Sequence, residues 1–245
     1  MNPPSRPPVR LDRDLHTHTT FSDGADAVAA TVAAAQAVGL AEVGLSDHVR
    51  AGTDWLPGYV AEVRRVAADA PLPVSCGVEA KVLDTAGRLD LPVDLSGVEY
   101  VLVADHQVPL PAGPARPADV RESLAAGRLS PAAVVEHLVA ATVAALAGCP
   151  RPAGLAHLFS VLPKVGLTED DVPDDAVRAV ARACRAAGAW VELNEKWRCP
   201  SVRVARLLHE DGVALGGGSD AHRPDAVGRW SYARDVLTAL LPARR

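Results

Sequence analysis

Short, continuous apolar runs alternate along the chain with longer segments whose apolar residues recur at helical spacing. Continuous runs of this kind favour strands that are buried on both faces, as in parallel sheets. They predict strands over residues 13–17, 42–46, 74–80, 100–104, 154–157, 190–194 and 214–219. Helices are predicted between them, over residues 26–38, 59–69, 130–146, 174–187, 201–210 and 225–241. Residues 108–128, rich in Pro, Ala and Arg, predict an irregular loop with room for one helical turn.

Local signals set several of these boundaries. Ser130 and Pro131 are typical of an N-cap and a first helical position, and Gly188 is typical of the residue after a helix. Repeated strand–helix units favour one parallel α/β fold, and seven strands with helices between them favour a barrel over an open sheet. We therefore expect an α/β barrel in a single domain over residues 13–245, preceded by a flexible tail over residues 1–12.

Composition narrows the class of protein. The 245 residues are enough for one α/β barrel or two small domains, and the net charge of −5 argues against a broad nucleic-acid-binding surface. The first ten residues lack the apolar segment of a signal peptide, and no apolar run is expected to approach the length of a membrane span. The four cysteines form no CxxC motif, so reduced thiols in a cytoplasmic protein are expected.

Side chains that can bind metals gather where the predicted strands end. Two pairs at spacing i, i+2, His16 with His18 and Asp220 with His222, lie near the two ends of the chain. On a strand this spacing points both side chains toward the same face. The carboxyl ends of the strands in a parallel barrel share one face, where active sites form. The metal-capable residues at these ends are His16, His18, Asp47, His48, Glu79, Asp105, His106, His157, Asp220 and His222.

This set predicts more than one ion. A single Zn, Mn or Fe ion takes about four to six ligands, so the cluster needs two or three ions with a bridging carboxylate. Glu79, the lone acid on a central strand, is the natural bridge. Such ions give hydroxide at neutral pH from a bridging water and hold the oxygens of a phosphate ester, which predicts a hydrolase. Glu79, Asp220 and His222 are the residues we expect at the centre of catalysis.

The motifs DLHTHTTFSDG, GLSDH, GVEA, VADH, GLAHL and GSDAH occur in this order over nearly the whole chain. The series resembles that of the polymerase-and-histidinol-phosphatase (PHP) family. The resemblance implies a distorted (β/α)7 TIM-like barrel with a trinuclear metal site that hydrolyses phosphate esters. It also implies that the ligands are His16, His18, His48, Glu79, His106, His157, Asp220 and His222.

The ninth ligand position departs from several members of the family. Where they carry a further ligand, often His, after the HxH motif, this chain has Ser22-Asp23-Gly24. Two interpretations of Asp23 stay open: a carboxylate ligand of a third ion, or a cap for the helix beginning near Asp26. An Asp ligand would shift the preference of that site toward Mn or Fe. Asp47 and Asp105 are expected to orient imidazoles or to bond the backbone rather than to bind metal.

Basic residues beyond the strand ends predict an anionic substrate. Lys81, Lys164, Lys196, Arg50 and Arg223 follow the predicted strand ends and would surround the mouth of the barrel. Lys196, Arg198 and Arg223 are the candidates for holding a phosphate.

The leading hypothesis from the sequence is a phosphatase that acts on a small-molecule phosphate monoester, similar to histidinol phosphatases. Nucleic acid is expected only as a short substrate. One alternative is a phosphodiesterase or 3′–5′ exonuclease like the PHP domain of family X DNA polymerases. An amide or lactone hydrolase is less favoured because no clear Lys ligand is present, and a catalytically silent metal-binding module is the non-enzymatic alternative.

Overall fold

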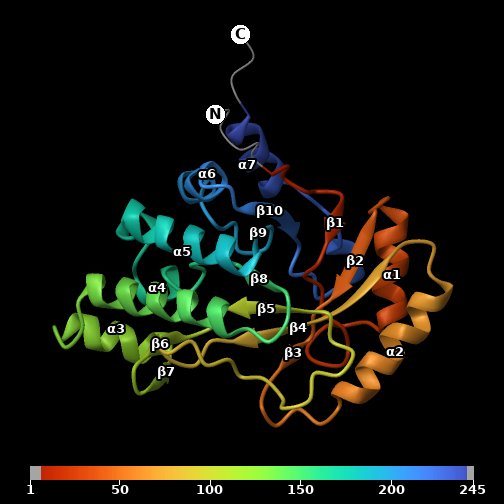
Figure 1. Cartoon of the computed structure of the whole chain (residues 1–245), viewed down its shortest axis with the longest axis horizontal. Helices are drawn as coiled ribbons and strands as arrows, with labels where there is room; N and C mark the ends of the chain where they lie inside the picture. The colour runs from red at the N-terminus through yellow and green to blue at the C-terminus, as the bar shows by residue number, and fades with distance from the viewer. Residues whose placement is uncertain (1–6, 242–245) are drawn as a thin grey trace.

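Seven parallel strands form a nearly closed barrel surrounded by helices (Figure 1). The structure is a computed structural model and describes residues 7–241. The barrel strands, in spatial order, are β1 (Arg13–Asp14), β2 (Glu42–Leu45), β4 (Val74–Lys81), β5 (Tyr100–Ala104), β8 (Ala153–Ala156), β9 (Trp190–Asn194) and β10 (Ala214–Gly218). Parallel bridges from Arg10 to Gly216 and from Thr17 to Ala221 join the first and last strands. The α/β, TIM-like barrel expected from the sequence is therefore confirmed.

The helices pack around the barrel and bury its outer face (Figure 1). Their bounds are α1 Val28–Ala37, α2 Leu56–Asp69, α3 Pro117–Ala125, α4 Pro131–Gly148, α5 Asp174–Ala187, α6 Val202–Glu210 and α7 Tyr232–Leu240. Strand β5, with the sequence YVLVA, is buried at every position, as expected for a strand covered on both faces. The α4 helix begins as predicted, because the Ser130 hydroxyl accepts a hydrogen bond from the Ala133 N–H and Pro131 occupies its first turn.

The prediction of an irregular loop over residues 108–128 is wrong. Strands β6 (Val108–Leu110) and β7 (Gly113–Ala115) form an antiparallel hairpin there, followed by α3. Gly113 adopts a φ of 127°, which a residue with a side chain rarely reaches, and this allows the tight turn. Pro117 then starts α3, whose Val120 is buried. Here Pro117 starts a helix and Gly113 allows a hairpin turn, so neither residue prevents regular structure.

The C-terminal helix begins later than the sequence predicts. A short 3-10 helix covers Pro224–Ala226, and Gly228 then takes a left-handed φ of 64° before α7 starts at Tyr232. The Trp230 indole in this connection donates a hydrogen bond to the Leu11 carbonyl. This hydrogen bond holds the connection against the N-terminal residues. It is a tertiary interaction, so the periodicity of the sequence does not reveal it.

The structure describes part of the predicted N-terminal tail, and one long helix differs from expectation. Residues 1–6 of the predicted tail lie outside the described residues, but Arg10 bonds to β10 and the Pro7 carbonyl accepts from His209. At least this part of the predicted tail packs on the barrel. The expectation that no apolar run approaches a membrane span fails for α4, which is long and apolar enough by length and composition. In the fold α4 packs against α5 and contributes Val134, Leu138 and other residues to the core.

Candidate metal centre

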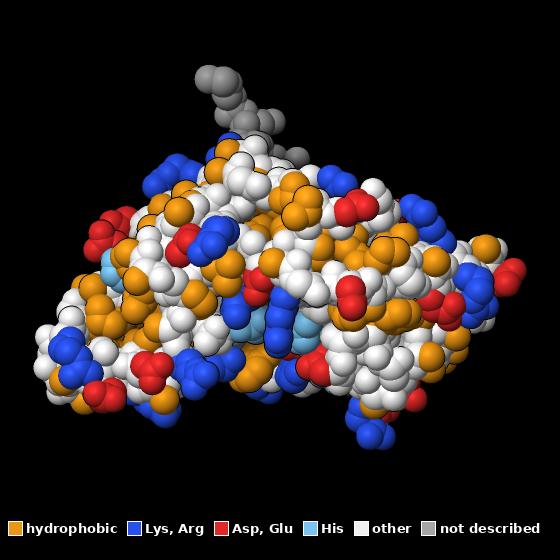
Figure 2. All heavy atoms as spheres, turned by 90° about the horizontal axis from the view of Figure 1, so that it is seen from below, with side chains coloured by type: hydrophobic (Ala, Val, Ile, Leu, Met, Phe, Trp, Pro, Cys, Tyr) orange, Lys and Arg blue, Asp and Glu red, His pale blue; other side chains and the backbone are white. Residues whose placement is uncertain are grey.

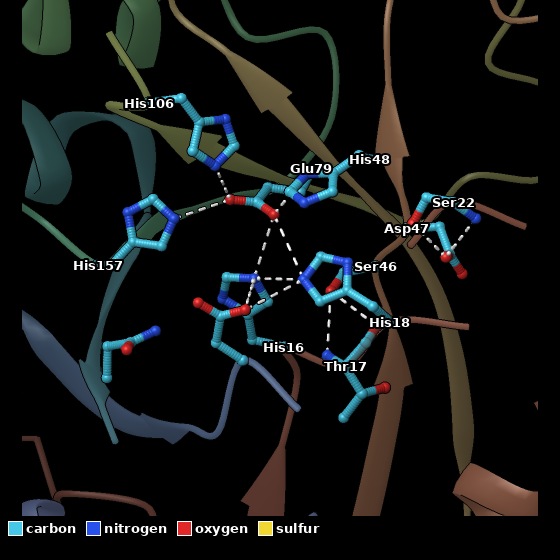
Figure 3. A network of polar contacts seen from close by, with 12 residues as sticks. His16, Thr17, His18, Ser22, Ser46, Asp47, His48, Glu79, His106 and His157 are labelled. Carbon is cyan, nitrogen blue, oxygen red and sulfur yellow. Dashed lines mark hydrogen bonds and ion pairs between the residues drawn. The ribbon is translucent and has the colours of Figure 1, made fainter. Parts of the chain in front are cut away.

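The barrel brings the candidate ligands from six strands to one face. His48 begins β3 (His48–Val49), which pairs with β4 so that His48 is in register with Glu79. The bridge from Thr17 to Ala221 places the His16/His18 pair beside the Asp220/His222 pair. His106 and His157 follow the neighbouring strands β5 and β8. The strand ends therefore converge as the sequence predicts (Figure 3).

Glu79 is the centre of the cluster. Its side chain is 1% exposed, and imidazoles surround both of its oxygens (Figure 3). Oε1 lies 2.9 Å from Nε2 of His106 and 2.9 Å from Nε2 of His157. Oε2 lies 2.9 Å from Nδ1 of His48, 3.2 Å from Nε2 of His16 and 3.5 Å from Nε2 of His18. A carboxylate with each oxygen facing a different set of imidazoles has the geometry of a bridge between ions.

The deepest group of ligand atoms fits a metal ion. Nε2 of His16 and Nε2 of His18 lie 3.1 Å apart, and Oδ1 of Asp220 lies 3.4 Å from Nε2 of His18. Ligand atoms about 2.0–2.1 Å from a zinc ion in a tetrahedron lie roughly 3.3 Å from one another. All three side chains are buried. The donor atoms thus point at a common centre at the spacing that a cation requires.

A second group gathers around Asp23, at the more exposed edge. One Asp23 oxygen lies 3.3 Å from Nε2 of His222 and 3.5 Å from Nε2 of His48, and the other lies 3.8 Å from Nδ1 of His18. That His18 nitrogen is buried and has no hydrogen-bond partner among the described residues. Asp23 does not cap α1, whose N-cap is Ala27 with no side-chain hydrogen bond. Of the two interpretations of Asp23, the geometry favours the ligand.

The comparisons with known proteins agree with this geometry. The model of the PHP domain family matches residues 14–196. The chain belongs to the PHP domain family. Histidinol phosphate phosphatase from Lactococcus lactis has a similar fold, with 16% identity, 92% of each chain covered and a TM-score of 0.63. A candidate histidinol phosphatase from Listeria monocytogenes gives 15% identity, coverage of 89% of this chain and 97% of the other, and a TM-score of 0.65. No curated protein matches the chain.

The PHP assignment confirms the family resemblance of the motifs, and with it the enzyme class, a metal-dependent phosphoesterase. The match with the family model ends at residue 196, so it does not include Asp220 and His222. In the fold these two residues lie beside the other candidate ligands, because β10 closes the barrel next to β1. We call this cluster of candidate ligands around Glu79 the PHP centre.

Charge in the PHP centre is shared between buried carboxylates and imidazoles. Burial disfavours a charged Glu79, but His16 and His106 outweigh it and hold the Glu79 pKa well below its usual value. Burial also opposes a charged His157, yet Asp105 and Glu79 raise its pKa to about 10. Burial and the neighbouring His16 instead lower the pKa of His18 to about 4. The metal-free centre thus keeps its carboxylates charged and holds a proton on His157 that a cation would replace.

The two acidic residues next to the imidazoles have different roles. Oδ1 of Asp105 lies 3.2 Å from Nδ1 of His157 and accepts a hydrogen bond from the Ser160 hydroxyl, so Asp105 orients an imidazole as expected. Asp47 instead accepts hydrogen bonds from Thr19 and Ser22, side chain and backbone alike. Asp47 therefore holds the loop that carries Asp23 and contacts no imidazole directly.

Sequence reasoning missed Glu192. This buried residue lies in β9, and its Oε2 is 2.8 Å from Nδ1 of His16. The available signal was an acid and an amide, Glu192 and Asn194, at alternate positions of an otherwise apolar strand. Two polar side chains on the inner face of a buried strand need partners there.

Four of the candidate basic residues line two cavities beside the PHP centre. Figure 2 shows a hollow with His side chains inside and Lys and Arg side chains around it. Lys196 and Arg223 line a cavity of about 890 Å³ next to Asp220 and His222. The second cavity, of about 810 Å³, includes Arg50 and Lys81 together with His48 and Glu79. Arg198, by contrast, lies over the Tyr232 ring at 5.2 Å and lines neither cavity.

Proposed function

We propose that this protein is a phosphatase that hydrolyses a small-molecule phosphate monoester with two to three divalent ions (Zn, Mn or Fe). The observation that carries the proposal is the buried Glu79, which is surrounded by five imidazoles and lines one of the two cavities. The residues proposed to hold the ions are His16, His18, Asp23, His48, Glu79, His106, His157, Asp220 and His222. When bound, the ions would supply Lewis-acid activation of the phosphate and of the attacking water.

The chain's own residues would hold the substrate phosphate next to the ions. Lys196 Nζ lies 3.2 Å from Oδ1 of Asp220 and 3.3 Å from Nδ1 of His222, so its charge is already at the edge of the centre. Arg223 lines the same cavity and offers a guanidinium that matches phosphate oxygens. We propose Lys196 and Arg223 for phosphate binding and leave out Arg198, which packs on Tyr232.

Asp220, His222 and Glu79 are proposed to act at the reacting atoms. Asp220 receives hydrogen bonds from Lys196 and from the Trp197 indole, which direct its carboxylate. Nδ1 of His222 lies 2.9 Å from the Asp220 carbonyl, the nearer of its two polar neighbours, and Nε2 faces Asp23. His222 is thus set to bind or to exchange a proton through Nε2.

A monoester is favoured by the likeness to the Lactococcus lactis enzyme, which was solved with zinc, L-histidinol and phosphate. Histidinol phosphate is therefore the first substrate to test. A phosphodiesterase is the second candidate, because candidate ligands line two cavities that could each take one substituent of a diester. A cytoplasmic location is part of the proposal and agrees with four free cysteines, three of them buried.

The test combines metal analysis with phosphate release. The purified protein would be loaded with Zn, Mn or Fe and assayed on histidinol phosphate, other monoesters and short diesters, with a chelator-treated sample as control. We expect more than one ion per chain and faster release from a monoester than from any diester. Full metal loading without phosphate release from any ester would refute the proposal, and preferred cleavage of diesters would favour the second candidate.

A further inference from the structure

The geometry points to Glu192 as a positioning residue that fixes the His16 imidazole so that Nε2 faces the metal centre. The inference rests on the proposed function in one respect, that His16 holds an ion. Glu192 itself does not belong to any of the groups of potential ligands. It acts through His16, from the side of the imidazole that faces away from Glu79.

The contacts of Glu192 define its task. The side chain is 2% exposed and lies on β9, beneath the centre. Oε2 and Oε1 lie 2.8 Å and 3.0 Å from Nδ1 of His16, so both carboxylate oxygens face that nitrogen and Oε2 is the nearer, while Nε2 of the same ring lies 3.2 Å from Oε2 of Glu79. A neutral imidazole carries one proton, and an Nδ1–H donated to Glu192 leaves the lone pair on Nε2. Within residues 7–241 Glu192 has no Lys or Arg partner, so its charge acts on His16.

The other oxygen of Glu192, Oε1, accepts hydrogen bonds from two groups that can only donate at this position. Oε1 accepts a hydrogen bond from the His157 backbone N–H at 2.5 Å and from the Asn194 amide at 2.7 Å. The Asn194 side chain cannot rotate its oxygen toward Glu192, because that oxygen already accepts the Trp197 N–H at 2.7 Å. Glu192 therefore supports His157 through its backbone as well as His16 through its ring.

The neighbouring strand is shaped to fit this carboxylate. A Cβ on Gly218 would lie 2.2 Å from Oε2 of Glu192, so a side chain there would displace the oxygen that faces His16. Two residues earlier on the same face of β10, a Cβ on Gly216 would meet nothing closer than the Arg10 carbonyl at 3.4 Å. Glycine is thus required at position 218 because the Glu192 carboxylate occupies the space that a side chain would take, whereas position 216 has room for a Cβ.

Glu192→Gln tests the tautomer with almost no change in shape. The two fixed donors at Oε1 require the Gln oxygen, so its NH2 takes the place of Oε2, the nearer of the two atoms to Nδ1 of His16. This arrangement favours the His16 tautomer with its proton on Nε2, which cannot bind a metal there. We expect roughly 10–100-fold weaker zinc binding, as is usual when the partner of a ligating His is lost. Binding would be measured by competition with a chromophoric chelator, with circular dichroism as the check on folding.

Two further measurements separate positioning from a general structural role. In ¹⁵N NMR spectra of the zinc-loaded wild type, His16 should carry its proton on Nδ1; in Glu192→Gln at the same zinc concentration it should carry it on Nε2. In a double-mutant cycle, Glu192→Gln should weaken zinc binding much less in a His16→Ala background than in the wild type. An unprotonated Nδ1 in the wild type, or fully additive losses, would overturn the inference.

Gly218→Ala offers an independent variant that keeps the carboxylate. It should weaken zinc binding in the same direction as Glu192→Gln, while Gly216→Ala, its matched control, should leave zinc binding within about twofold of the wild type. Equal effects of the two alanines would contradict the inference. A wild type that loads zinc but releases no phosphate would refute only the proposed function, because none of these measurements uses catalysis.

Discussion

The deep and the open sides of the metal centre are built differently. On the deep side His16 and His157 are buried, and each has its Nδ1 next to a carboxylate, Glu192 for the first and Asp105 for the second. These carboxylates fix ring rotation before any ion arrives. Burial opposes a charge on either ring, but the carboxylates outweigh it and raise the pKa of both, so that each ring loses a proton when it binds an ion. Ligands that need no rearrangement lose little entropy on binding, so the deep side is preorganised.

The open side has no such support. The side chains of His48, His106 and His222 are 32%, 31% and 26% exposed, and Asp23 is 53% exposed. Among the described residues the carboxylates near these rings are the proposed ligands themselves. Ions on this side must order their own ligands and compete with water. The comparison therefore predicts tightly held ions at the deep side and exchangeable ones at the open side.

Glu79 joins the two sides, and its removal should have the largest effect. Glu79→Gln removes the charge that both sets of imidazoles share, so ions on both sides should be lost. We expect phosphate release to fall by at least about 10³-fold, more than for loss of one hydrogen bond to a transition state. Metal content by mass spectrometry and phosphate release would be measured together. Glu42→Gln, a partly buried carboxylate on β2 bonded to Ser75, is the control and should keep both.

One variant from each side tests the comparison directly. His16→Ala should remove an ion that dialysis cannot remove from the wild type, and lower phosphate release by roughly 10²–10³-fold. His48→Ala should lose an ion that excess metal in the assay restores in part, because its side chain is 32% exposed and, among the described residues, the carboxylates at its two ring nitrogens are proposed ligands themselves. Metal content before and after dialysis gives the answer. Equal retention of metal in the two variants would contradict the difference between the sides.

The barrel, and the gathering of the proposed ligands at one of its faces, could be predicted from the sequence, because each depends on local signals. Continuous apolar runs marked the strands, and the imidazoles of His106 and His157 followed their ends directly. The hairpin at residues 108–115 was missed, because the turn depends on the φ of Gly113 rather than on periodicity. Single short strands carry too little pattern to be recognised alone.

The carboxylate that supports His16 could not be predicted, because the contact depends on which strands become neighbours in the barrel. Glu192 meets His16 only because β10 and β1 close the barrel, which brings residues 176 positions apart in sequence into contact. In the same way the place of Arg198 over Tyr232 depends on the path of α7. Position after a strand end was enough to predict which imidazoles and carboxylates gather around Glu79, but not where the Lys and Arg side chains lie, because these long side chains can point away from the centre.

The pH dependence of metal binding should reflect the deep side. In the metal-free protein the pKa of His157 is raised to about 10, so at pH 8 this ring carries a proton that a metal must displace. Metal binding should therefore release protons, and the apparent affinity should rise by about tenfold per pH unit for each proton released, up to about pH 10. His18, with its pKa lowered to about 4, should release none above pH 6.

Calorimetric titrations with zinc in buffers of different ionisation enthalpy would count the protons. Asp105→Asn is the informative variant, because it removes the carboxylate that most raises the His157 pKa by hydrogen bonding. Fewer protons should be released at pH 8 by that variant than by the wild type. An unchanged count would mean that the proton comes from elsewhere in the centre.

The smallest effect is expected at Asp23, the most exposed carboxylate of the open side. Asp23→Ala removes one oxygen ligand but leaves His48 and His222 in place, so we expect loss of one exchangeable ion and about a tenfold fall in phosphate release, recovered in part with excess Mn. Asp26→Ala, two residues before the start of α1, is the control and should change neither the metal content nor phosphate release. Because Asp23 forms no cap on α1, the thermal midpoint of the metal-free protein should stay the same. A lower midpoint with full metal content would restore the capping interpretation and would leave the open side with one ligand fewer than the geometry suggests.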